Sequence, residues 1–196
     1  METIVDQKNR LRTTLLEKRS TMGERVCHSK SQAIKKRVLA LPEFAEATIV
    51  HFYLSDLMEV QTDGLIEEAF QLQKQVVVPL LDQVALSQIN ELDPNHFTLN
   101  RLGMRSPKKQ FCKAVSKACV DLWIIPGIGY DRMGNRLGRG AGYYDRLLSG
   151  VVKKTIGLAF ECQIVEAIPL GENDCKVDQI ITEERTIICG GINDVN

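Results

Sequence analysis

The chain has 196 residues, and 44% of them are apolar, so we predict a single domain over residues 1–196 with one substantial core. Its 25 lysines and arginines balance its 25 aspartates and glutamates, so no overall charge draws it to nucleic acid or anionic lipid. The N-terminus lacks the apolar core of a secretory signal, and no apolar run is long enough to span a membrane. We therefore expect a soluble, cytoplasmic protein.

The first forty residues predict two helices. Leu11 and Leu15 lie one helical turn apart, which indicates an amphipathic helix from about residue 4 to about residue 20. Thr21 and Glu24 have the spacing of a capping box, which would begin a second helix that ends before Pro42. We expect this helical segment, residues 4–41, to pack on the rest of the domain.

From residue 48 onward, strands and helices alternate. Strands are predicted at 48–54, 76–81, 85–92, 121–130, 155–160, 177–182 and 185–189, and helices at 65–73, 142–150 and 162–168. Thr62 is the expected N-cap of the first of these helices, and residues 92–120 are expected to be loop with one short helix. This alternation predicts a three-layer α/β/α fold with a mostly parallel sheet.

A glycine-rich segment follows the most apolar strand. Its glycines are Gly127, Gly129, Gly134, Gly138, Gly140 and Gly142. A loop after a parallel strand lies where α/β sheets bind ligands, and glycine lets backbone N–H groups wrap an anion. Arg136 and Arg139 would suit phosphoryl oxygens, and Asp131 and Asp145 a magnesium ion. The spacing fits neither a P-loop nor a dinucleotide fingerprint, so it predicts phosphate and nothing finer; a flexible turn with solvated arginines is the alternative.

This segment resembles the 5-formyltetrahydrofolate cyclo-ligase family, through Pro126-Gly127 and the string from Asn135 to Asp145. The similarity extends to KNRLR (8–12), YLSDLMEVQT (53–62), LAFECQIVEAIP (158–169) and DCKVDQIIT (174–182). Ala141 stands where the family often has lysine or glycine, and Ser106 where it often has glutamate. The resemblance implies ATP-dependent closure of 5-formyltetrahydrofolate to 5,10-methenyltetrahydrofolate with Mg²⁺, and a fold related to sugar-phosphate isomerases and CoA transferases.

The resemblance also implies which residues bind the nucleotide. They are Lys8, Arg12, Arg136, Leu137, Gly138, Arg139, Gly140, Ala141, Gly142, Tyr143, Tyr144 and Asp145. Arg139 and Tyr144 are the expected catalytic residues, and Arg139 would stabilise charge on the moving phosphoryl group. From position alone, a solvated helix face is the favoured interpretation of Lys8, Arg12 and Arg19, and the resemblance reverses this for Lys8 and Arg12 more than for Arg19. Tyr143 could equally be a core aromatic.

On the folate side, the resemblance implies that Glu59 holds the pterin, whose ring N–H groups match a carboxylate. The apolar wall that a flat ring requires is expected from Tyr53, Leu54 and Met58. Asp145 and Asp178 are the expected magnesium ligands, although either could instead cap a helix or strand end. His51 and Trp123 are expected in the core.

Two other classes remain open on these residues. One is a sugar-phosphate isomerase or CoA-transferase-like enzyme, which would work without ATP. The other is a nucleotide- or RNA-binding module that uses the basic loop, but the neutral net charge argues against it. We expect a monomer with a small-molecule substrate, and neither a nucleic-acid nor a membrane partner.

Overall fold

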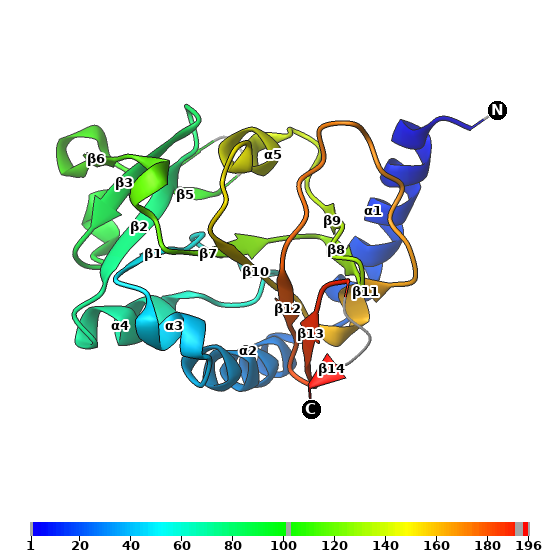
Figure 1. The fold of residues 1–196 in the computed structure, drawn as a ribbon, viewed down its shortest axis with the longest axis horizontal. Coiled ribbons are helices and arrows are strands. Elements are labelled where there is room, and N and C mark those ends of the chain that lie inside the picture. Colours follow the sequence, from blue (N-terminus) through cyan, green and yellow to red (C-terminus); the bar gives the residue numbers. More distant parts are fainter. Residues whose placement is uncertain (1, 101–102, 191–193, 196) are drawn as a thin grey trace.

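The computed structural model describes residues 2–100, 103–190 and 194–195, and in this part of the chain the main sheet has nine strands (Figure 1). In spatial order they are β14 (Asp194–Val195), β13 (Thr186–Ile188), β12 (Gln179–Ile181), β10 (Lys154–Leu158), β7 (Leu122–Pro126), β1 (Ile49–His51), β2 (Gln75–Leu80), β3 (Ala85–Ile89) and β6 (Lys113–Val115). The central strands β12, β10, β7, β1 and β2 run parallel, and antiparallel strands extend both edges.

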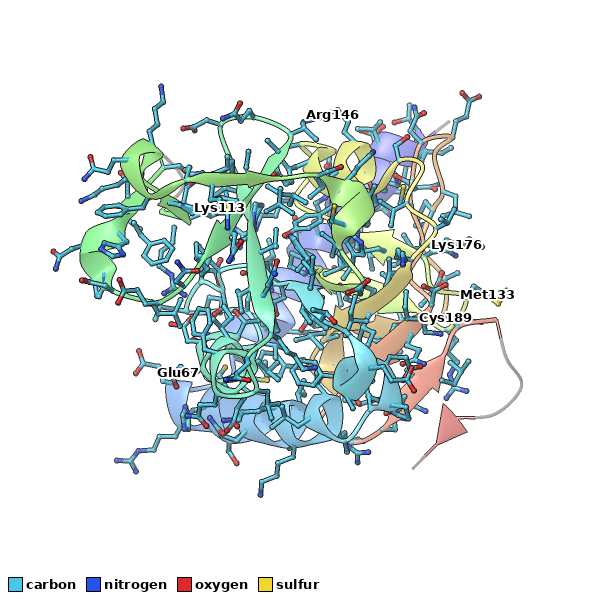
Figure 2. All side chains as sticks on the ribbon, turned by 60° about the vertical axis from the view of Figure 1, so that its left-hand side comes forward. Glu67, Lys113, Met133, Arg146, Lys176 and Cys189 are labelled. Atoms are coloured by element: carbon cyan, nitrogen blue, oxygen red, sulfur yellow. The ribbon has the colours of Figure 1, made fainter. Side chains whose placement is uncertain are left out.

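Helices cover both faces of this sheet. Three of them, α2 (Glu24–Leu39), α3 (Pro42–Glu46) and α4 (Asp63–Gln71), lie below it in Figure 1, and α5 (Tyr143–Leu148) lies above. Side chains fill both layers (Figure 2): Ile34 of α2 shares a buried cluster with Val50 of β1, and Leu147 of α5 shares another with Trp123 of β7. The predicted three-layer α/β/α fold with a mostly parallel sheet is confirmed.

The first helix, α1 (Ile4–Ser20), has the predicted bounds and stands to one side, next to a small second sheet (Figure 1). In spatial order, that sheet contains β11 (Ile164–Val165), β8 (Gly129–Asp131) and β9 (Arg136–Leu137). Leu15 of α1 is buried in a cluster with Ile128, Leu137 and Ile168. This apolar contact fixes α1 beside the glycine-rich segment.

The predicted capping box at Thr21 and Glu24 is wrong. The N-cap of α2 is Gly23, which offers no side chain, and the Thr21 hydroxyl donates instead to the carbonyl oxygen of Lys18 at 2.7 Å. A capping box does form one helix earlier, between Thr3 and Asp6 at the start of α1. The Thr21 hydroxyl is taken up by the end of α1, so it is not available to the helix that follows.

The predicted strand at 48–54 is too long, because β1 ends at His51. Beyond it, side-chain hydroxyls donate to backbone carbonyl oxygens. The Tyr53 hydroxyl donates to the carbonyl oxygen of Val60 at 2.8 Å, and the Thr62 hydroxyl donates to the carbonyl oxygen of Tyr53 at 2.7 Å. Thr62 occupies the predicted N-cap position of α4, but its side chain makes no cap bond there.

The predicted helix at 162–168 is also wrong. The chain forms a 3₁₀ turn at Glu161–Gln163 and then β11. The Gln163 side chain donates to the carbonyl oxygens of Gly127 at 3.0 Å and Ile128 at 2.9 Å, which ties this segment to the glycine-rich connection. Tertiary hydrogen bonds therefore override its apolar periodicity.

The predicted loop at 92–120 contains more regular structure than expected. A hairpin of β4 (Phe97–Leu99) and β5 (Arg105–Pro107) lies within it, and 3₁₀ turns occur at Pro94–His96, Lys109–Phe111 and Lys117–Cys119. Residues 101–102 of this prediction lie outside the described residues. In the part of the chain that the structure describes, no helix is long and apolar enough to cross a membrane.

Candidate functional site

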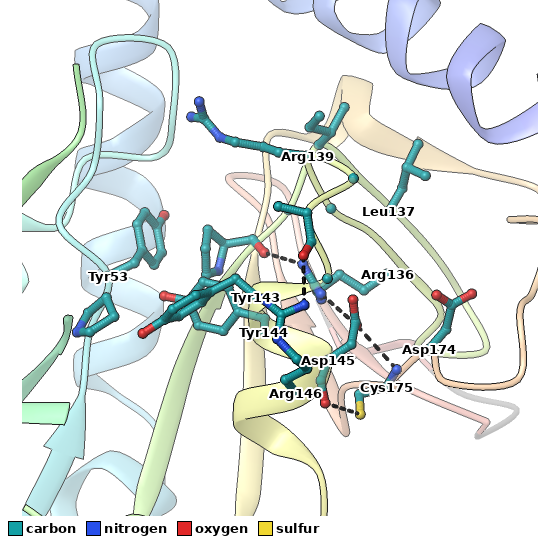
Figure 3. Close-up of a pocket in the computed structure, with 18 of the residues that line it drawn as sticks. Tyr53, Arg136, Leu137, Arg139, Tyr143, Tyr144, Asp145, Arg146, Asp174 and Cys175 are labelled. Atoms are coloured by element: carbon teal, nitrogen blue, oxygen red, sulfur yellow. Dashed lines mark hydrogen bonds and ion pairs between the residues drawn. The ribbon is translucent and has the colours of Figure 1, made fainter. Parts of the chain in front are cut away.

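A cleft of about 1270 Å³ opens where β1, β2 and β7 end (Figure 3). Its walls come from α1, the end of β2, the hairpin of β4 and β5, residues 126–128, 136–146 and 172–175, and three residues after β1, namely Tyr53, Leu54 and Glu59. The carboxyl ends of parallel strands are the expected place for a ligand in an open α/β sheet. The cleft brings together segments that lie far apart in the sequence.

A loop of residues 138–142 borders the cleft. Gly140 and Gly142 have φ angles of 101° and 62°, a left-handed backbone that favours glycine. Arg12 Nε donates to the carbonyl oxygen of Gly138 at 2.8 Å, and Arg146 Nη1 donates to that of Ala141 at 2.8 Å. Two guanidinium groups thus brace the loop and add positive charge beside it, which suits an anion.

Arg136 is a fixed cation in this cleft, only 6% exposed. Its Nη2 donates to Asp145 Oδ1 at 2.8 Å, its Nη1 donates to the carbonyl oxygen of Pro126 at 3.3 Å, and its guanidinium carbon lies 5.6 Å from the centre of the Tyr144 ring (Figure 3). These partners hold the charge in place, because each restrains a different side of the guanidinium.

Lys8 has an acidic partner that the sequence did not predict. Its ammonium forms an ion pair with Asp174, which also accepts the backbone N–H of Gly171 at 2.7 Å. Burial raises the pKa of the Asp174 carboxyl, but the Lys8 and Gly171 hydrogen bonds outweigh it, and the pKa lies below its usual value. Arg19, on the same helix, is buried and does not line the cleft.

Of the two expected magnesium ligands, Asp145 and Asp178, the structure places only one at the cleft. Asp145 lines the cleft, but Asp178 does not, because its Oδ2 accepts the backbone N–H of Thr155 at 2.7 Å and the hydroxyl of the same residue at 2.8 Å. Asp178 therefore joins the start of β10 to β12, which is the structural alternative considered above. Asp131 is buried in its own turn, where it accepts the N–H groups of Met133 and Asn135.

Arg139 reaches across the cleft instead of toward its own loop. Its Nη2 donates to Glu59 Oε1 at 2.9 Å and forms a second ion pair with Asp56 (Figure 3 shows its direction). Burial lowers the pKa of the guanidinium, but Glu59 and Asp56 more than compensate, and the pKa is raised. The residue expected at the phosphate and the residue expected at the pterin are therefore in contact.

Three aromatic residues line the cleft: Tyr53, Tyr143 and Tyr144. The Tyr143 hydroxyl lies 3.2 Å from the carbonyl oxygen of Leu80, and the buried Tyr144 hydroxyl has no partner among the described residues. Burial raises the pKa of Tyr144 well above its usual value. Leu54 and Glu59 share this wall, whereas Met58 does not line the cleft.

Beneath the cleft, His51 is fully buried and stacks on Trp123 with ring centres 4.8 Å apart. Burial lowers the pKa of His51 to about 3, so the ring is neutral. The prediction that both residues belong to the core is confirmed.

Comparison with known proteins decides the family. The model of the 5-formyltetrahydrofolate cyclo-ligase family matches residues 4–183. The chain belongs to this family. A probable 5-formyltetrahydrofolate cyclo-ligase of Caenorhabditis elegans is 29% identical over 96% of this chain and 98% of its own length, and the cyclo-ligase of Escherichia coli K12 is 27% identical over 91% and 97%. The predicted family and its ligase class are confirmed.

Solved structures agree with this membership. The 5,10-methenyltetrahydrofolate synthetase of Aquifex aeolicus has a TM-score of 0.82 and 28% identity, and the alignment covers 96% of each chain. The synthetase of Mycoplasma pneumoniae, at 23% identity and a TM-score of 0.70, shares the fold. Family membership therefore favours the predicted ligase over the isomerase- and transferase-like alternatives considered from the sequence.

Two acidic partners of the cleft's cations were missed by sequence reasoning. Asp174 lies in the matched string DCKVDQIIT, so the signal was present, but Asp178 was chosen within it. Asp56 lies within YLSDLMEVQT, and no spacing rule links it to Arg139, 83 residues away. Contact across the fold is the only signal for such a pair.

Proposed function

We propose that this chain catalyses the ATP-dependent closure of 5-formyltetrahydrofolate to 5,10-methenyltetrahydrofolate, with release of ADP and phosphate. The observation that carries the proposal is that the basic loop of residues 136–145 and the wall around Glu59 line one cleft. A phosphoryl donor and a flat carboxylate-binding ring would then meet in the same space. The names of the family and of its relatives supply the substrate.

The proposed chemistry replaces a poor leaving group by a good one. The formyl oxygen attacks the terminal phosphorus of ATP and ADP departs; the neighbouring amine nitrogen of the folate then attacks the activated carbon, loses its proton, and phosphate leaves. Such a transfer needs positioning and charge neutralisation more than covalent help from the protein. Lys8, Arg12, Arg136 and Arg139 would provide the charge.

The cleft also fits a nucleotide bound with Mg²⁺. Asp145 and Asp174 both line it beside the basic residues, and magnesium typically takes one or two carboxylates together with phosphate oxygens. Among the described residues, no group of three or more histidine, cysteine, aspartate or glutamate side chains forms a separate metal site. When bound, the ion would neutralise charge on the phosphates.

On the folate side, we assign Glu59 to the pterin N–H groups and Tyr53 and Leu54 to its apolar wall, which leaves out Met58. The Glu59 side chain is only 11% exposed, so a hydrogen bond from a ring would form in a partly desolvated place. We assign no proton transfer to Tyr144, whose hydroxyl is buried; its ring instead contacts Arg136.

The predicted location and assembly stay predictions. A relative from Arabidopsis thaliana is named as mitochondrial, and nothing in the fold distinguishes a cytoplasmic from an organellar member.

The test is to mix the protein with 5-formyltetrahydrofolate and Mg-ATP and to follow both the near-ultraviolet absorbance of the methenyl-bridged product and ADP. We expect equal amounts of ADP and methenyl product. ADP that forms equally fast without folate would make the protein an ATPase and contradict the proposal.

A further inference from the structure

Arg139 makes ion pairs with the opposite wall of the cleft. Its Nη2 contacts Glu59 Oε1 at 2.9 Å and also Asp56. The two carboxylates precede it by 80 and 83 residues, so the contact depends on the fold and not on local sequence. One cation is thus shared by two acids.

The segment that carries both carboxylates is organised by its own hydrogen bonds. Asp56 Oδ1 accepts the N–H of Met58 at 2.8 Å, and Glu59 Oε2 accepts the N–H of Asp56 at 3.1 Å. The Gln61 amide donates to the carbonyl oxygens of Asp56 at 2.7 Å and Glu59 at 2.9 Å. Each carboxylate therefore accepts a backbone N–H of the loop on one oxygen and contacts Arg139 with the other. The loop thus holds both carboxylates in position to bind one cation.

This contact conflicts with the roles assigned above. Arg139 and the backbone N–H of Asp56 each occupy one of the Glu59 oxygens, so a pterin would compete with Arg139 for Glu59, and Arg139 points away from the loop of residues 138–142 while it pairs with this wall. We therefore expect binding of the two substrates to rearrange this ion pair.

We propose that Asp56 is a positioning residue that, together with Glu59, holds Arg139 on the folate side of the cleft, so that Arg139 turns to the nucleotide once a folate has taken Glu59. The inference rests on the proposed function and adds that folate binding precedes the contact between Arg139 and the nucleotide. It couples the nucleotide to the folate, which would limit ATP consumption when no folate is present.

The strength of the hold suits such an exchange. The Arg139 side chain is 40% exposed and that of Asp56 is 26% exposed, so solvent screens their attraction. A pair of this kind changes an affinity by about two- to five-fold. Two carboxylates together keep Arg139 in place, but a single one left after folate binding competes weakly with a polyphosphate, which carries several charges.

The experiment compares the wild type with Asp56→Asn in the binding of a nonhydrolysable ATP analogue with Mg²⁺, measured by calorimetry without and with 5-formyltetrahydrofolate. In the wild type, the folate should tighten analogue binding. In Asp56→Asn, analogue binding without folate should tighten by about two- to five-fold, because one of the two carboxylates that hold Arg139 is neutral. The tightening caused by folate should shrink by the same factor, because folate then has less of this hold to release. Asp56→Glu keeps the charge and should preserve most of the coupling.

Asp63→Asn is the matched control. Asp63 makes the same kind of ion pair, to Arg105 Nη1 at 3.0 Å on the same side of the cleft, but it does not contact Arg139. The inference is overturned when Asp56→Asn and Asp63→Asn give the same analogue affinity, or when Asp56→Asn lowers kcat without tightening the analogue. A wild type that neither binds the analogue nor forms methenyl product would refute the proposed function instead, so the two failures are distinguishable.

Discussion

Arg139→Ala removes the assigned cation that pairs with Asp56 and Glu59. If the guanidinium turns to the γ-phosphoryl group as charge develops there, its loss should lower kcat by about 10²–10³, the effect of removing one preorganised electrostatic donor. Four cations remain near the loop, Lys8, Arg12, Arg136 and Arg146, so nucleotide affinity should change much less.

The folate KM should respond differently. In the variant, Glu59 no longer shares an oxygen with Arg139, so the pterin does not have to displace an ion pair. Because that pair is partly exposed, the folate KM should fall by no more than about five-fold. Arg139→Lys should recover only part of kcat, since an ammonium keeps the charge but cannot offer two parallel donors.

The assay is steady-state methenyl formation with each substrate varied, alongside analogue binding and thermal unfolding. Arg10→Ala serves as the control: it makes the same change on exposed α1 surface, where Arg10 pairs with Glu2. A well-folded Arg139→Ala protein with near-normal kcat would refute the reasoning and move the role to Arg136 or Lys8.

Three further outcomes are expected. Glu59→Gln should raise the folate KM by the equivalent of about 1.5–3 kcal/mol and the ATP KM far less, and equal changes in both would indicate a disturbed loop. Asp174→Asn should raise the Mg²⁺ concentration for half-maximal rate about tenfold, or ~1.4 kcal/mol, whereas Asp178→Asn should leave it unchanged; the reverse pattern would restore Asp178 as the ligand. Burial lowers the pKa of His51 in the folded protein to about 3 from its ordinary value of 6.5, so its contribution to the free energy of unfolding is complete above pH 6.5 and is lost as the pH falls, by up to ~1.4 kcal/mol per pH unit. His51→Phe should flatten this acid part of the free energy of unfolding measured with urea against pH. An unchanged pH dependence would exclude His51 as its cause.

Much of the fold could be predicted because it depends on local patterns. The apolar strands β7 and β10 were found from composition, and α1 from its leucines. Two errors occurred where side chains bond to backbone elsewhere in the chain: Gln163 bonds to Gly127 where a helix was predicted, and the bonds of Tyr53 and Thr62 follow the early end of β1. Such bonds have no signature in a single sequence. The capping-box error is local, because the Thr21 hydroxyl bonds to Lys18.

The candidate site divides in the same way. The glycine-rich segment was recognised because glycine, arginine and a preceding strand are contiguous, and the left-handed Gly140 and Gly142 agree with that prediction. Asp178 was predicted as a magnesium ligand and Asp174 was not considered, although both lie in one matched string, because only the fold shows that Asp174 faces the cleft and Asp178 does not. Contacts between Arg139 and the folate wall join segments that sequence periodicity treats separately.

The most direct test of the central claim follows the formyl oxygen. We would prepare 5-formyltetrahydrofolate with a heavy-oxygen isotope in its formyl group, allow the protein to consume it with Mg-ATP, and analyse the released phosphate by mass spectrometry. Phosphorylation of the formyl oxygen predicts that the heavy isotope appears in inorganic phosphate in step with methenyl product. Methenyl product formed with unlabelled phosphate, the heavy oxygen having passed to water, would contradict the account.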